Sequence, residues 1–344
     1  MISLVKEAPG RGNVSLQDMP SPQLDSGQVM IRVEAAGVCG SDLHIVQDDI
    51  KLNLRPPVIM GHEFCGAIEK VADDVSGWHP GDRVTAETTF RSCGRCRHCR
   101  TGSYNLCPQK ELIGYVHNGC FARFCVVPVA RVHRLPDRLS YEEGALCEPL
   151  ACTVHALMEM TTVHPGETVL VAGVGAIGLL SAQVARASGA RVIACGTQAD
   201  GPRLEIAAQL GVERTLNVDE QDALEITRSL TDGEGADLFV ECSGSPDAAR
   251  LGLSALRRGG RCCQIGLFGR PFEFDLEQVA YKELQVVGSI GSKWTSWRTA
   301  LQLLTTGQVD ARLLIDEPLP LTRWQEAFAH AQAKQGIKAL LRPE

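Results

Sequence analysis

Residues 168–178 read Thr-Val-Leu-Val-Ala-Gly-Val-Gly-Ala-Ile-Gly, and this stretch decides the fold. Its first five residues form a continuous apolar run, which is typical of a strand buried on both faces. The motif Gly-x-Gly-x-x-Gly follows at residues 173–178 and opens a helix-compatible stretch, residues 177–188. The glycine motif alone is not specific, but a strand before it and a helix after it indicate a dinucleotide-binding turn.

Each glycine has a physical role in such a turn. Gly173 permits the tight bend, Gly175 lets a pyrophosphate approach the backbone, and Gly178 lets the helix pack closely on the strand. The helix start, at Ala176 and Ile177, then offers unpaired N–H groups and the positive end of the helix dipole to the phosphates. The alternative, an ordinary glycine-rich turn between a strand and a helix, is less favoured in this context.

The segment that follows alternates strands and helices. We expect strands at residues 191–195, 215–218, 238–241 and 261–265, and helices at residues 202–210 and 222–230. Strands that alternate with helices of this length predict a parallel sheet covered on both faces.

The first 150 residues have a different pattern, in which short strands are separated by Gly and Pro turns. Strands are expected at residues 29–33, 65–71, 83–86 and 122–127. From residue 288 the chain carries two helix-like stretches, 297–306 and 323–335, and an apolar run at 337–341. That tail is too short for a domain of its own.

A chain of 344 residues is longer than a single hydrophobic core usually supports, so two domains are expected. We predict an α/β protein in which a mostly β domain comprises residues 1–150 and 288–344. The parallel-sheet domain is then inserted between them, at residues 151–287.

Net charge and the distribution of apolar residues indicate which kinds of binding partner are disfavoured. The net charge of −7 disfavours nucleic acid and membrane surfaces, since both reward an excess of Lys and Arg. The N-terminus reads as a strand (Ile2, Leu4, Val5) without the pattern of a signal peptide, and no apolar run approaches the roughly 20 residues that span a bilayer. We therefore expect a cytoplasmic protein without nucleic-acid or membrane partners.

Four of the fourteen cysteines lie within fifteen residues, at Cys93, Cys96, Cys99 and Cys107. In a cytosolic chain, clustered thiols are more often metal ligands than disulfides. Four thiolates suit a closed, tetrahedral, structural zinc site. A redox or iron–sulfur cluster is the alternative, but its usual spacings differ from these.

A second set of candidate ligands is dispersed along the chain and comprises Cys39, His62, Glu63 and Glu148. One thiolate, one imidazole and one or two carboxylates suit a zinc ion that keeps a position for water or substrate. Taken singly, each residue also has an ordinary explanation as core filler, buried histidine or surface charge. Their spacing alone does not join them.

The end of the second strand of a dinucleotide-binding domain usually decides between NAD and NADP. An acidic residue there binds the ribose hydroxyls and repels a 2′-phosphate. In this chain Gly196 and Thr197 occupy that place, and Asp200 lies four residues further on, within reach of the ribose. Arg203 is assigned to the following helix. We expect NAD, with Thr197 and Asp200 near the ribose, and NADP stays open.

Seven motifs in order resemble the zinc-dependent medium-chain dehydrogenases, and most closely their sorbitol dehydrogenase branch. They are residues 37–44, 61–66 (GHEFCG), 81–84 (GDRV), the four-cysteine segment, 142–150 (EEGALCEPL), 173–178 and 241–244 (ECSG). The resemblance covers nearly the whole chain, and several independent motifs in one order are more specific than any single one.

The resemblance implies a GroES-like catalytic domain interrupted by a Rossmann domain. It also implies that Cys39, His62 and Glu63 bind a catalytic zinc, with Glu148 as a fourth ligand or as one that binds through water. Carboxylates at both of these positions resemble polyol and threonine dehydrogenases more than simple ethanol dehydrogenases.

Further roles follow from the same resemblance. Ser41 and His44 are similar to the proton relay of the family, which leads toward the cofactor ribose and solvent. Beside the glycine-rich turn, further cofactor contacts are expected from Ser243, Gly266, Leu267 and Ser289.

Two stretches depart from the family pattern. Gly196 replaces the usual Asp at the strand end, and residues 288–293 lack the Arg that sorbitol dehydrogenases offer to their polyol. Lys293 or His117 can take the place of that Arg.

Together these observations predict an enzyme that transfers a hydride between a secondary alcohol, such as a polyol, sugar or sugar acid, and a nicotinamide cofactor. It would hold one catalytic and one structural zinc ion and form a homo-oligomer, a tetramer or a dimer. An L-threonine 3-dehydrogenase-type enzyme is one alternative, and it needs a cation for the substrate carboxylate. A zinc-ribbon regulatory protein, or a cofactor-binding protein that has lost catalysis, are alternatives from other classes.

Overall fold

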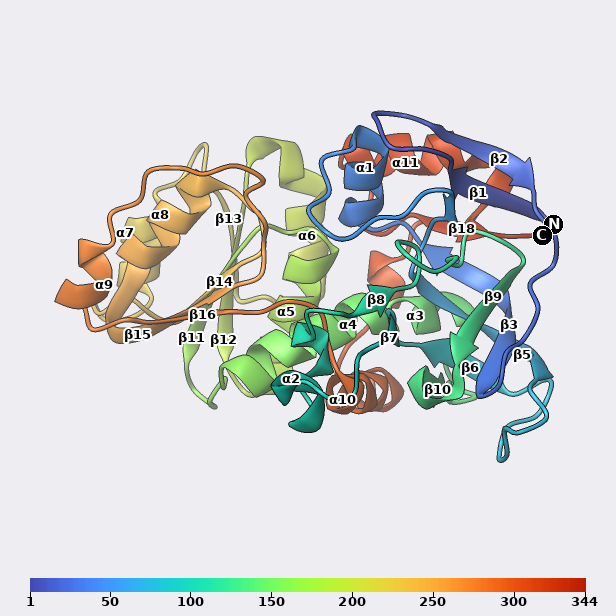
Figure 1. Cartoon of the computed structure of the whole chain (residues 1–344). Coiled ribbons are helices and arrows are strands. Elements are labelled where there is room, and N and C mark those ends of the chain that lie inside the picture. The colour runs from blue at the N-terminus through green and yellow to red at the C-terminus, as the bar shows by residue number, and fades with distance from the viewer. The chain divides into compact units, whose positions relative to one another are not determined.

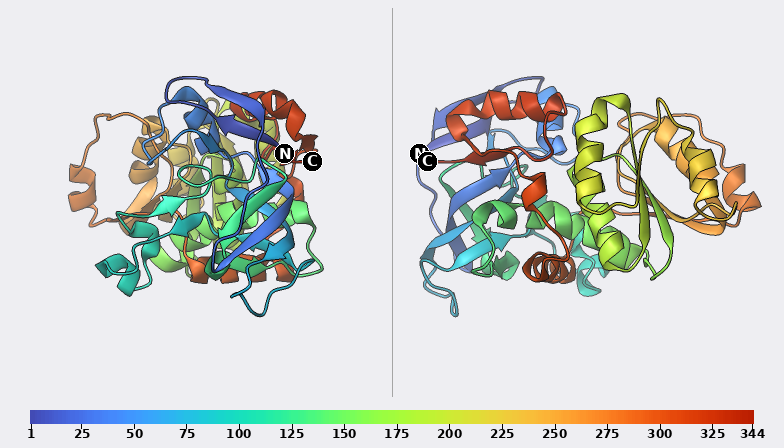
Figure 2. Two further views of the ribbon diagram at one scale, coloured as in Figure 1. Left: turned by 45° about the vertical axis from the view of Figure 1, so that its right-hand side comes forward. Right: turned by 180° about the vertical axis from the view of Figure 1, so that it is seen from behind.

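The computed structural model describes residues 1–344, and the chain divides into two compact units. Unit 1 comprises Met1–Glu148, Ser292–Thr305 and Ile315–Glu344, and unit 2 comprises Pro149–Gly291 and Thr306–Leu314. Figures 1 and 2 show the many short strands of unit 1 and the alternating strands and helices of unit 2.

Unit 1 is built on a sheet of seven strands. These are β3 (Gln28–Gly37), β5 (Glu63–Val71), β6 (Arg83–Ala86), β9 (Phe124–Pro128), β10 (Val132–Arg134), β17 (Leu319–Pro320) and β18 (Leu340–Arg342). Six of them follow the order β10-β6-β5-β3-β18-β17, and β9 also pairs with β3. Since β18 lies antiparallel to β3, the C-terminal tail completes the sheet that the N-terminal segment begins.

Two smaller sheets and several helices complete unit 1. One sheet has the order β2-β1-β4, and the other pairs β7 with β8. The strands are β1 (Ile2–Lys6), β2 (Val14–Asp18), β4 (Val58–Ile59), β7 (Thr89–Arg91) and β8 (Glu111–Leu112). The helices are α1 (Gly40–Gln47), α2 (Arg97–Arg100), α3 (Tyr141–Ala145), α10 (Trp294–Thr306) and α11 (Trp324–Gln332), and α4 (Cys147–Val154) begins at the end of the unit.

Unit 2 contains one fully parallel sheet of six strands in the order β13-β12-β11-β14-β15-β16. The strands are β11 (Thr168–Ala172), β12 (Arg191–Gly196), β13 (Arg214–Asn217), β14 (Ala236–Glu241), β15 (Leu256–Gln264) and β16 (Gln285–Gly288). The helices are α5 (Ala176–Ala187), α6 (Gly201–Gln209), α7 (Ala223–Ser229), α8 (Pro246–Ala255) and α9 (Glu277–Tyr281). This strand order is that of the Rossmann fold.

The core of unit 2 explains why its strands read as apolar runs. Leu170 and Ala172 of β11 pack in one cluster with residues of α7 and α8. Successive side chains of a strand point to opposite faces, so Val169 and Val171, which are also buried, face the other side. The strand is therefore covered on both faces, as its sequence predicts.

Several predicted elements are confirmed, and others were missed. Strands 83–86 and 168–172 have the predicted bounds, whereas β3 is longer than the predicted 29–33. Helix α8 was missed, although Ser245 caps its N-terminus through the N–H of Ala248 and Pro246 stands in its first turn. None of the helices is both long enough and apolar enough to cross a membrane.

The unit boundaries differ from the expected ones at residues 306–314. This segment packs with unit 2, although the sequence groups it with the tail. Its partner is Gln183 of α5, whose side chain accepts from the N–H of Asp310 at 2.7 Å and donates to its carbonyl at 3.3 Å. A polar side chain buried in a helix gives no signal of its distant partner in the sequence.

Candidate active site and metal centres

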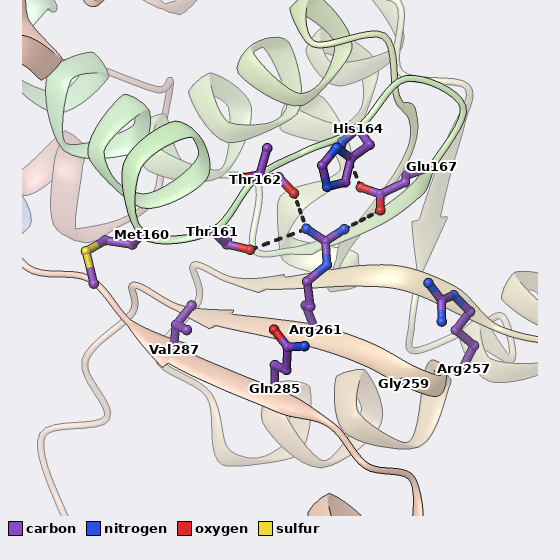
Figure 3. A pocket seen from close by; sticks show the side chains of 10 residues that line it. All are labelled: Met160, Thr161, Thr162, His164, Glu167, Arg257, Gly259, Arg261, Gln285 and Val287. Carbon is purple, nitrogen blue, oxygen red and sulfur yellow. Dashed lines mark hydrogen bonds and ion pairs between the residues drawn. The ribbon is translucent and has the colours of Figure 1, made fainter.

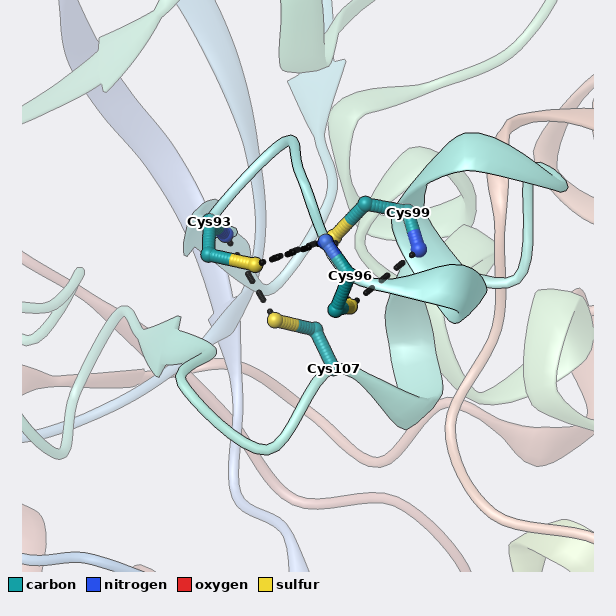
Figure 4. A group of neighbouring side chains, drawn as sticks. All are labelled: Cys93, Cys96, Cys99 and Cys107. Carbon is teal, nitrogen blue, oxygen red and sulfur yellow. Dashed lines mark hydrogen bonds between the residues drawn. The ribbon is translucent and has the colours of Figure 1, made fainter.

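The four clustered cysteines lie on a lobe between β7 and β8. Their side chains gather around one point (Figure 4), and their Sγ atoms all lie within 4.8 Å of one another. The Sγ atoms of Cys96 and Cys99 are 3.5 Å apart, and those of Cys93 and Cys99 are 3.9 Å apart. A tetrahedral zinc ion with Zn–S bonds of about 2.3 Å places its sulfur atoms roughly 3.8 Å apart. The four thiols therefore fit such an ion and are too far apart for disulfides.

Backbone donors prepare this cluster for a cation. The N–H groups of Cys96 and Cys99 donate to the sulfurs of Cys93 and Cys96, respectively. Hydrogen bonds from the backbone of Arg95 and Cys96 lower the pKa of the Cys93 thiol to about 6. A thiolate is the form that binds metal, so the loop geometry favours binding.

A buried polar network anchors the lobe to the rest of unit 1. The Tyr104 hydroxyl donates to Glu87 Oε2 at 2.6 Å and accepts from the N–H of Trp294. Arg131 and His133 also reach the Glu87 carboxylate, at 3.3 and 3.1 Å. Because Glu87 is almost fully buried, it depends on these three partners to replace water.

The second candidate metal centre brings together three residues from two segments. Cys39 is the N-cap residue of α1, and His62 and Glu63 stand at the start of β5. One ligand atom of each lies within 4.8 Å of the other two. Distant positions in the sequence thus converge on one point, which their spacing alone did not establish.

Glycines create the space for this convergence. Gly37 of β3 stands opposite Glu63 of β5, and a Cβ atom at Gly37 would clash with the Glu63 carboxylate. Gly61 has a φ of +86°, and a Cβ there would meet the ring of Phe121 at 2.7 Å. Only glycine therefore allows the bend that delivers His62 and the close approach of the two strands.

Asp42 lies behind the histidine. Its Oδ2 atom accepts from the N–H of Cys39 at 2.9 Å, and its Oδ1 atom is 3.9 Å from His62 Nδ1. Both Oδ1 and Nδ1 are buried without a hydrogen-bond partner. Burial raises the pKa of Asp42 to about 6, against the charge of His62. A carboxylate behind an imidazole is the arrangement that orients a histidine toward a metal ion.

The charges around His62 favour a cation at this point. Burial alone would lower the pKa of His62, but the hydrogen bond to Cys39 and the charges of Cys39, Asp42 and Glu148 raise it to about 10. The same surplus of negative charge attracts a metal ion, and a thiolate, an imidazole and carboxylates are the donors that zinc prefers. The donor set therefore fits zinc.

Lys338 is a functional residue that the sequence interpretation missed. Its Nζ atom lies 2.7 and 3.0 Å from the two carboxylate oxygens of Glu63 and donates to the carbonyl of Val38 at 3.2 Å. Burial disfavours its charge, but the attraction of Glu63 raises the pKa of Lys338 above its usual value. A signal was present, since a lysine inside the apolar run 337–341 needs a buried partner.

Glu148 stands at the start of α4 and is also buried. Its Oε1 atom accepts from Thr88 Oγ1 at 2.9 Å, and burial raises its pKa. It does not join the compact group of Cys39, His62 and Glu63, although its charge acts on His62. This geometry suits a ligand that binds through water or after a small movement.

The two predicted relay residues lie on α1 but are not hydrogen-bonded to each other. Ser41 Oγ accepts from the Tyr115 hydroxyl at 2.8 Å, and the Tyr115 ring lies 5.4 Å from the His62 ring. His44 Nδ1 is 2.8 Å from Asp49 Oδ1, and its side chain is half exposed. Ser41 is thus next to the candidate metal centre, while His44 faces solvent. Tyr115 was not predicted.

The glycine-rich turn has the predicted geometry. Gly173 has a φ of +94°, and Gly175 is the N-cap of α5 with open space where a side chain would stand. A Cβ at Gly178 would clash with the carbonyl oxygen of Gly173. The turn therefore exposes its backbone to a pyrophosphate and lets helix and strand pack closely, as a dinucleotide requires.

At the end of β12, Asp200 makes hydrogen bonds that the sequence analysis did not predict. Asp200 Oδ2 accepts from the backbone N–H of Thr197 at 3.0 Å and from its hydroxyl at 2.7 Å. Its Oδ1 atom is 3.8 Å from Arg203 Nη1. Asp219 Oδ2 accepts from the N–H of Gln198 at 2.8 Å. Asp200 thus stabilises its own turn, and its part in ribose recognition stays a prediction.

The other predicted cofactor residues follow the carboxyl ends of neighbouring parallel strands. Ser243 follows β14 and donates its backbone N–H to Glu241 Oε1 at 2.8 Å. Gly266 and Leu267 follow β15, where Leu267 is exposed, and Ser289 follows β16. They share the sheet edge of the glycine-rich turn, which is where ligands bind in such sheets.

One hollow of unit 2 contains none of the predicted residues. It has a volume of about 490 Å³. Residues of β15 and β16 contribute to its lining (Figure 3). Its central cation, Arg261, donates to Thr161, to the carbonyl of Thr162 and to Glu167. Arg261 therefore has an evident structural partner, and the hollow is separate from the glycine-rich turn.

Comparisons with known families agree with this geometry. Residues 25–137 match the family described as alcohol dehydrogenase GroES-like domain, and residues 176–306 match the family described as zinc-binding dehydrogenase.

Three curated relatives align over essentially the whole chain. A sorbitol dehydrogenase of Halalkalibacterium halodurans is 39% identical and aligns over 100% of this chain and 99% of its own length. A D-arabitol-phosphate dehydrogenase of Enterococcus avium is 36% identical, with 99% and 97% covered. An L-threonine 3-dehydrogenase of Bacillus subtilis is also 36% identical, with 100% and 99% covered.

Solved structures are similar over the same extent. A protein of Sinorhizobium meliloti 1021, solved with NADP bound, has a TM-score of 0.91 at 30% identity, with 99% of both chains covered. An alcohol dehydrogenase of Escherichia coli CFT073, complexed with NADH, has a TM-score of 0.89 at 25% identity, again with 99% of both chains covered.

The two metal centres should respond differently to substitution. We expect about two zinc ions per purified chain, and Cys96→Ser should lose one of them together with stability, because a closed four-thiolate site contributes folding free energy. His62→Ala should lose the other, keep the fold and abolish turnover. Metal analysis and thermal melts check this, and about one zinc per chain that His62→Ala leaves in place would contradict the second site.

Replacing Lys338 should destabilise the protein most when metal is absent. Lys338→Met leaves the Glu63 carboxylate buried without a cation, which costs about 3 kcal/mol of unfolding free energy. Bound zinc can supply the missing charge, so the loss should shrink in the zinc-loaded protein. Urea unfolding with and without a chelator measures the difference, with Lys338→Arg as the charge-conserving control. Equal losses in both states would mean that the pair serves folding alone.

Proposed function

Because the chain belongs to the zinc-dependent medium-chain alcohol dehydrogenase family, in its polyol dehydrogenase-like branch, we propose that its substrate is the secondary alcohol of a polyol, sugar or sugar acid. It is an oxidoreductase that uses zinc and a nicotinamide cofactor. The observation that carries the substrate proposal is the donor set of Cys39, His62 and Glu63, with Glu148 nearby. Two carboxylates beside one thiolate resemble the set expected of polyol enzymes.

The division of labour follows from the two units. We propose that unit 1 binds the alcohol and the zinc ions, and that unit 2 binds the cofactor at the Gly173–Gly178 turn. Zinc held by Cys39, His62 and Glu63 would supply Lewis acidity that lowers the pKa of the substrate hydroxyl. The nicotinamide ring would accept the carbinol hydride.

Residues of the chain orient the metal ligands and transfer the substrate proton. Tyr115 donates a hydrogen bond to Ser41 Oγ, and Ser41 would be the first to accept the substrate proton while it gives up its own. Asp42 orients His62, and Lys338 holds Glu63. His44, paired with Asp49 at the surface, would pass the proton to solvent. Because Ser41 and His44 are not hydrogen-bonded to each other, the proton released by Ser41 would reach His44 through the ribose hydroxyls of the bound cofactor.

A threonine-type amino-alcohol dehydrogenase remains the second candidate, because L-threonine 3-dehydrogenases of several bacteria are 32–36% identical to this chain. A panel of polyols, aldonates and L-threonine, assayed with NAD and with NADP, separates the two. Turnover of L-threonine with none of the polyols or aldonates would overturn the polyol proposal.

We also propose a homo-oligomer, a tetramer or a dimer. Strand β16 ends the parallel sheet of unit 2, so one of its edges is unpaired. Large apolar side chains are exposed on and near this strand: Leu267, Leu276, Tyr281, Val286 and Ile290. Unpaired strand edges and exposed apolar residues favour association between copies.

A cytoplasmic location is proposed because all fourteen cysteines are free thiols, which suits a reducing compartment.

We propose NAD as the preferred cofactor. Asp200 and Asp219 both accept hydrogen bonds from backbone N–H groups at the end of β12, and the Arg203 guanidinium lies 3.8 Å from Asp200. The 2′-phosphate of NADP would therefore meet net negative charge.

Asp200→Asn should test that charge while keeping a cap acceptor. We expect kcat/KM for NADP to rise several-fold relative to NAD in this variant, with little change in melting temperature. Asp200→Ala, which removes the cap as well, should also lose about 1 kcal/mol of stability. A native preference for NADP of roughly tenfold, or about 1.4 kcal/mol, would contradict the NAD proposal.

The relay should show itself in the pH dependence of turnover. His44→Ala should slow alcohol oxidation most at low pH, where hydroxide is scarce, and the deficit should shrink as pH rises; a general base contributes about 10²–10⁴-fold. Tyr115→Phe keeps the ring beside His62 but frees Ser41, so it should lower kcat at every pH. A His44→Ala deficit that is constant with pH and accompanied by a lower melting temperature would assign His44 a structural role.

A further inference from the structure

We propose that a cationic cluster of unit 1 binds an anionic group, a phosphate or a carboxylate, at the far end of the substrate chain. The cluster consists of Arg55, Arg91 and His117, gathered around Glu111. This inference rests on the proposed function and narrows its substrate class to anionic polyols.

The cluster has a defined geometry. Glu111 Oε2 is 2.8 Å from Arg91 Nη2 and 2.7 Å from His117 Nε2, and Arg55 Nη1 lies 3.8 Å from Glu111 Oε1. The ring of Phe90 stacks on His117 at 3.7 Å with an interplanar angle of 15°. One carboxylate and one aromatic ring thus hold three cationic or donor side chains in a fixed group.

The charges in this group do not balance. Two guanidinium groups face one carboxylate, which leaves a net positive charge even when His117 is neutral. The side chains of Arg55 and Arg91 are 61% and 68% exposed, so donors on both remain available to a ligand. Guanidinium groups match phosphate and carboxylate oxygens, often through paired hydrogen bonds.

Stability alone does not explain the surplus. Arg91 and Glu111 stand opposite each other in the β7–β8 pair, where opposite charges stabilise strand pairing modestly. That contribution needs one arginine. A second arginine, 61% exposed and 3.8 Å from the carboxylate, adds little, because solvent screens the charge of an exposed side chain.

The cluster is tied to the candidate metal centre through two segments. Thr88, which donates to Glu148, directly precedes β7, the strand of Phe90 and Arg91. Tyr115, which donates to Ser41, accepts the backbone N–H of Arg55 on its carbonyl at 2.9 Å. Both segments therefore lead from the site of hydride transfer to the cluster.

The distance between the candidate metal centre and the cluster favours a long substrate. Arg91 lies three positions after Thr88, and an extended strand advances about 10 Å over three positions. A five- or six-carbon polyol phosphate is long enough for such a path. Its carbinol at one end can lie at the metal centre while the phosphate at the opposite end lies near the cluster. The carboxylate of L-threonine, one carbon from its carbinol, is too close.

The test compares matched substrates on the zinc-loaded enzyme. The kcat/KM values for D-arabitol phosphate against D-arabitol, galactitol 1-phosphate against galactitol, and D-gluconate against sorbitol give a preference for each anionic group. We expect at least one anionic partner to be preferred by roughly tenfold or more, the effect of charge-assisted hydrogen bonds. The comparisons with the phosphate esters and with D-gluconate show whether the cluster binds a phosphate or a carboxylate.

Variants then locate the preference. Arg55→Gln, Arg91→Gln and the double variant should reduce the anionic-to-neutral ratio by roughly tenfold or more, mainly through KM. Arg134→Gln is the matched control, because Arg134 is an exposed arginine of unit 1 paired with Asp82 at 3.0 Å. It should leave the ratio unchanged. A purely structural cluster predicts parallel losses on both substrates, an unchanged ratio and a lower melting temperature, and that result overturns the proposal.

Failure of the proposed function gives a different result. If no polyol is oxidised in either form, calorimetric titration of D-arabitol phosphate into the zinc-loaded protein still decides the inference. Binding that the double variant weakens supports the cluster, and absent or unaffected binding overturns it. A wild-type enzyme that oxidises polyols without preferring any anionic partner also overturns it, while leaving the proposed function intact.

Discussion

Burial of charge is the constraint on which unit 1 depends. Asp42, His62, Glu63, Glu148 and Lys338 are all buried in or beside one β-sheet. Charges removed from water are tolerated only when they are paired or coordinate a metal ion. The pair of Lys338 and Glu63 therefore explains a feature of topology. Because Lys338 lies two residues before β18, the C-terminal tail must return to β3 for the charge of Glu63 to be met.

The same constraint governs the four-cysteine lobe. The lobe adds almost no apolar core of its own, so we expect its position to depend on a metal ion held by the four cysteines and on the buried carboxylate of Glu87. Tyr104 reaches Glu87 from the lobe, and Arg131 and His133 reach it from the segment at β10. The His133 ring in turn stacks on Trp297 of α10 at 5.4 Å. One buried carboxylate thus links the lobe to the N-terminal segment and to the tail.

What the sequence predicts well is local. The strand 168–172, the glycine-rich turn and the four-cysteine loop are each specified by residues close in the chain, so period and spacing are sufficient. Lys338, Tyr115 and Asp200 acquire their roles from partners that spacing does not reveal. Lys338 meets Glu63 across 275 positions. Asp200 has a partner only three residues away, but whether it caps its turn or faces a ribose depends on side-chain direction, which spacing does not encode.

These constraints also say where specificity can reside. The donors at the metal centre are fixed by mutual charge and by glycines that admit no side chain, so they cannot vary with the substrate. The β7–β8 pair is different, because Arg91 at its outer end is exposed and can vary at little cost to stability. Substitution there changes charge without disturbing the buried network. Arg91 and Glu111 already form a balanced pair that would serve folding, so the approach of a second arginine, Arg55, to the same carboxylate is better explained by a ligand than by folding.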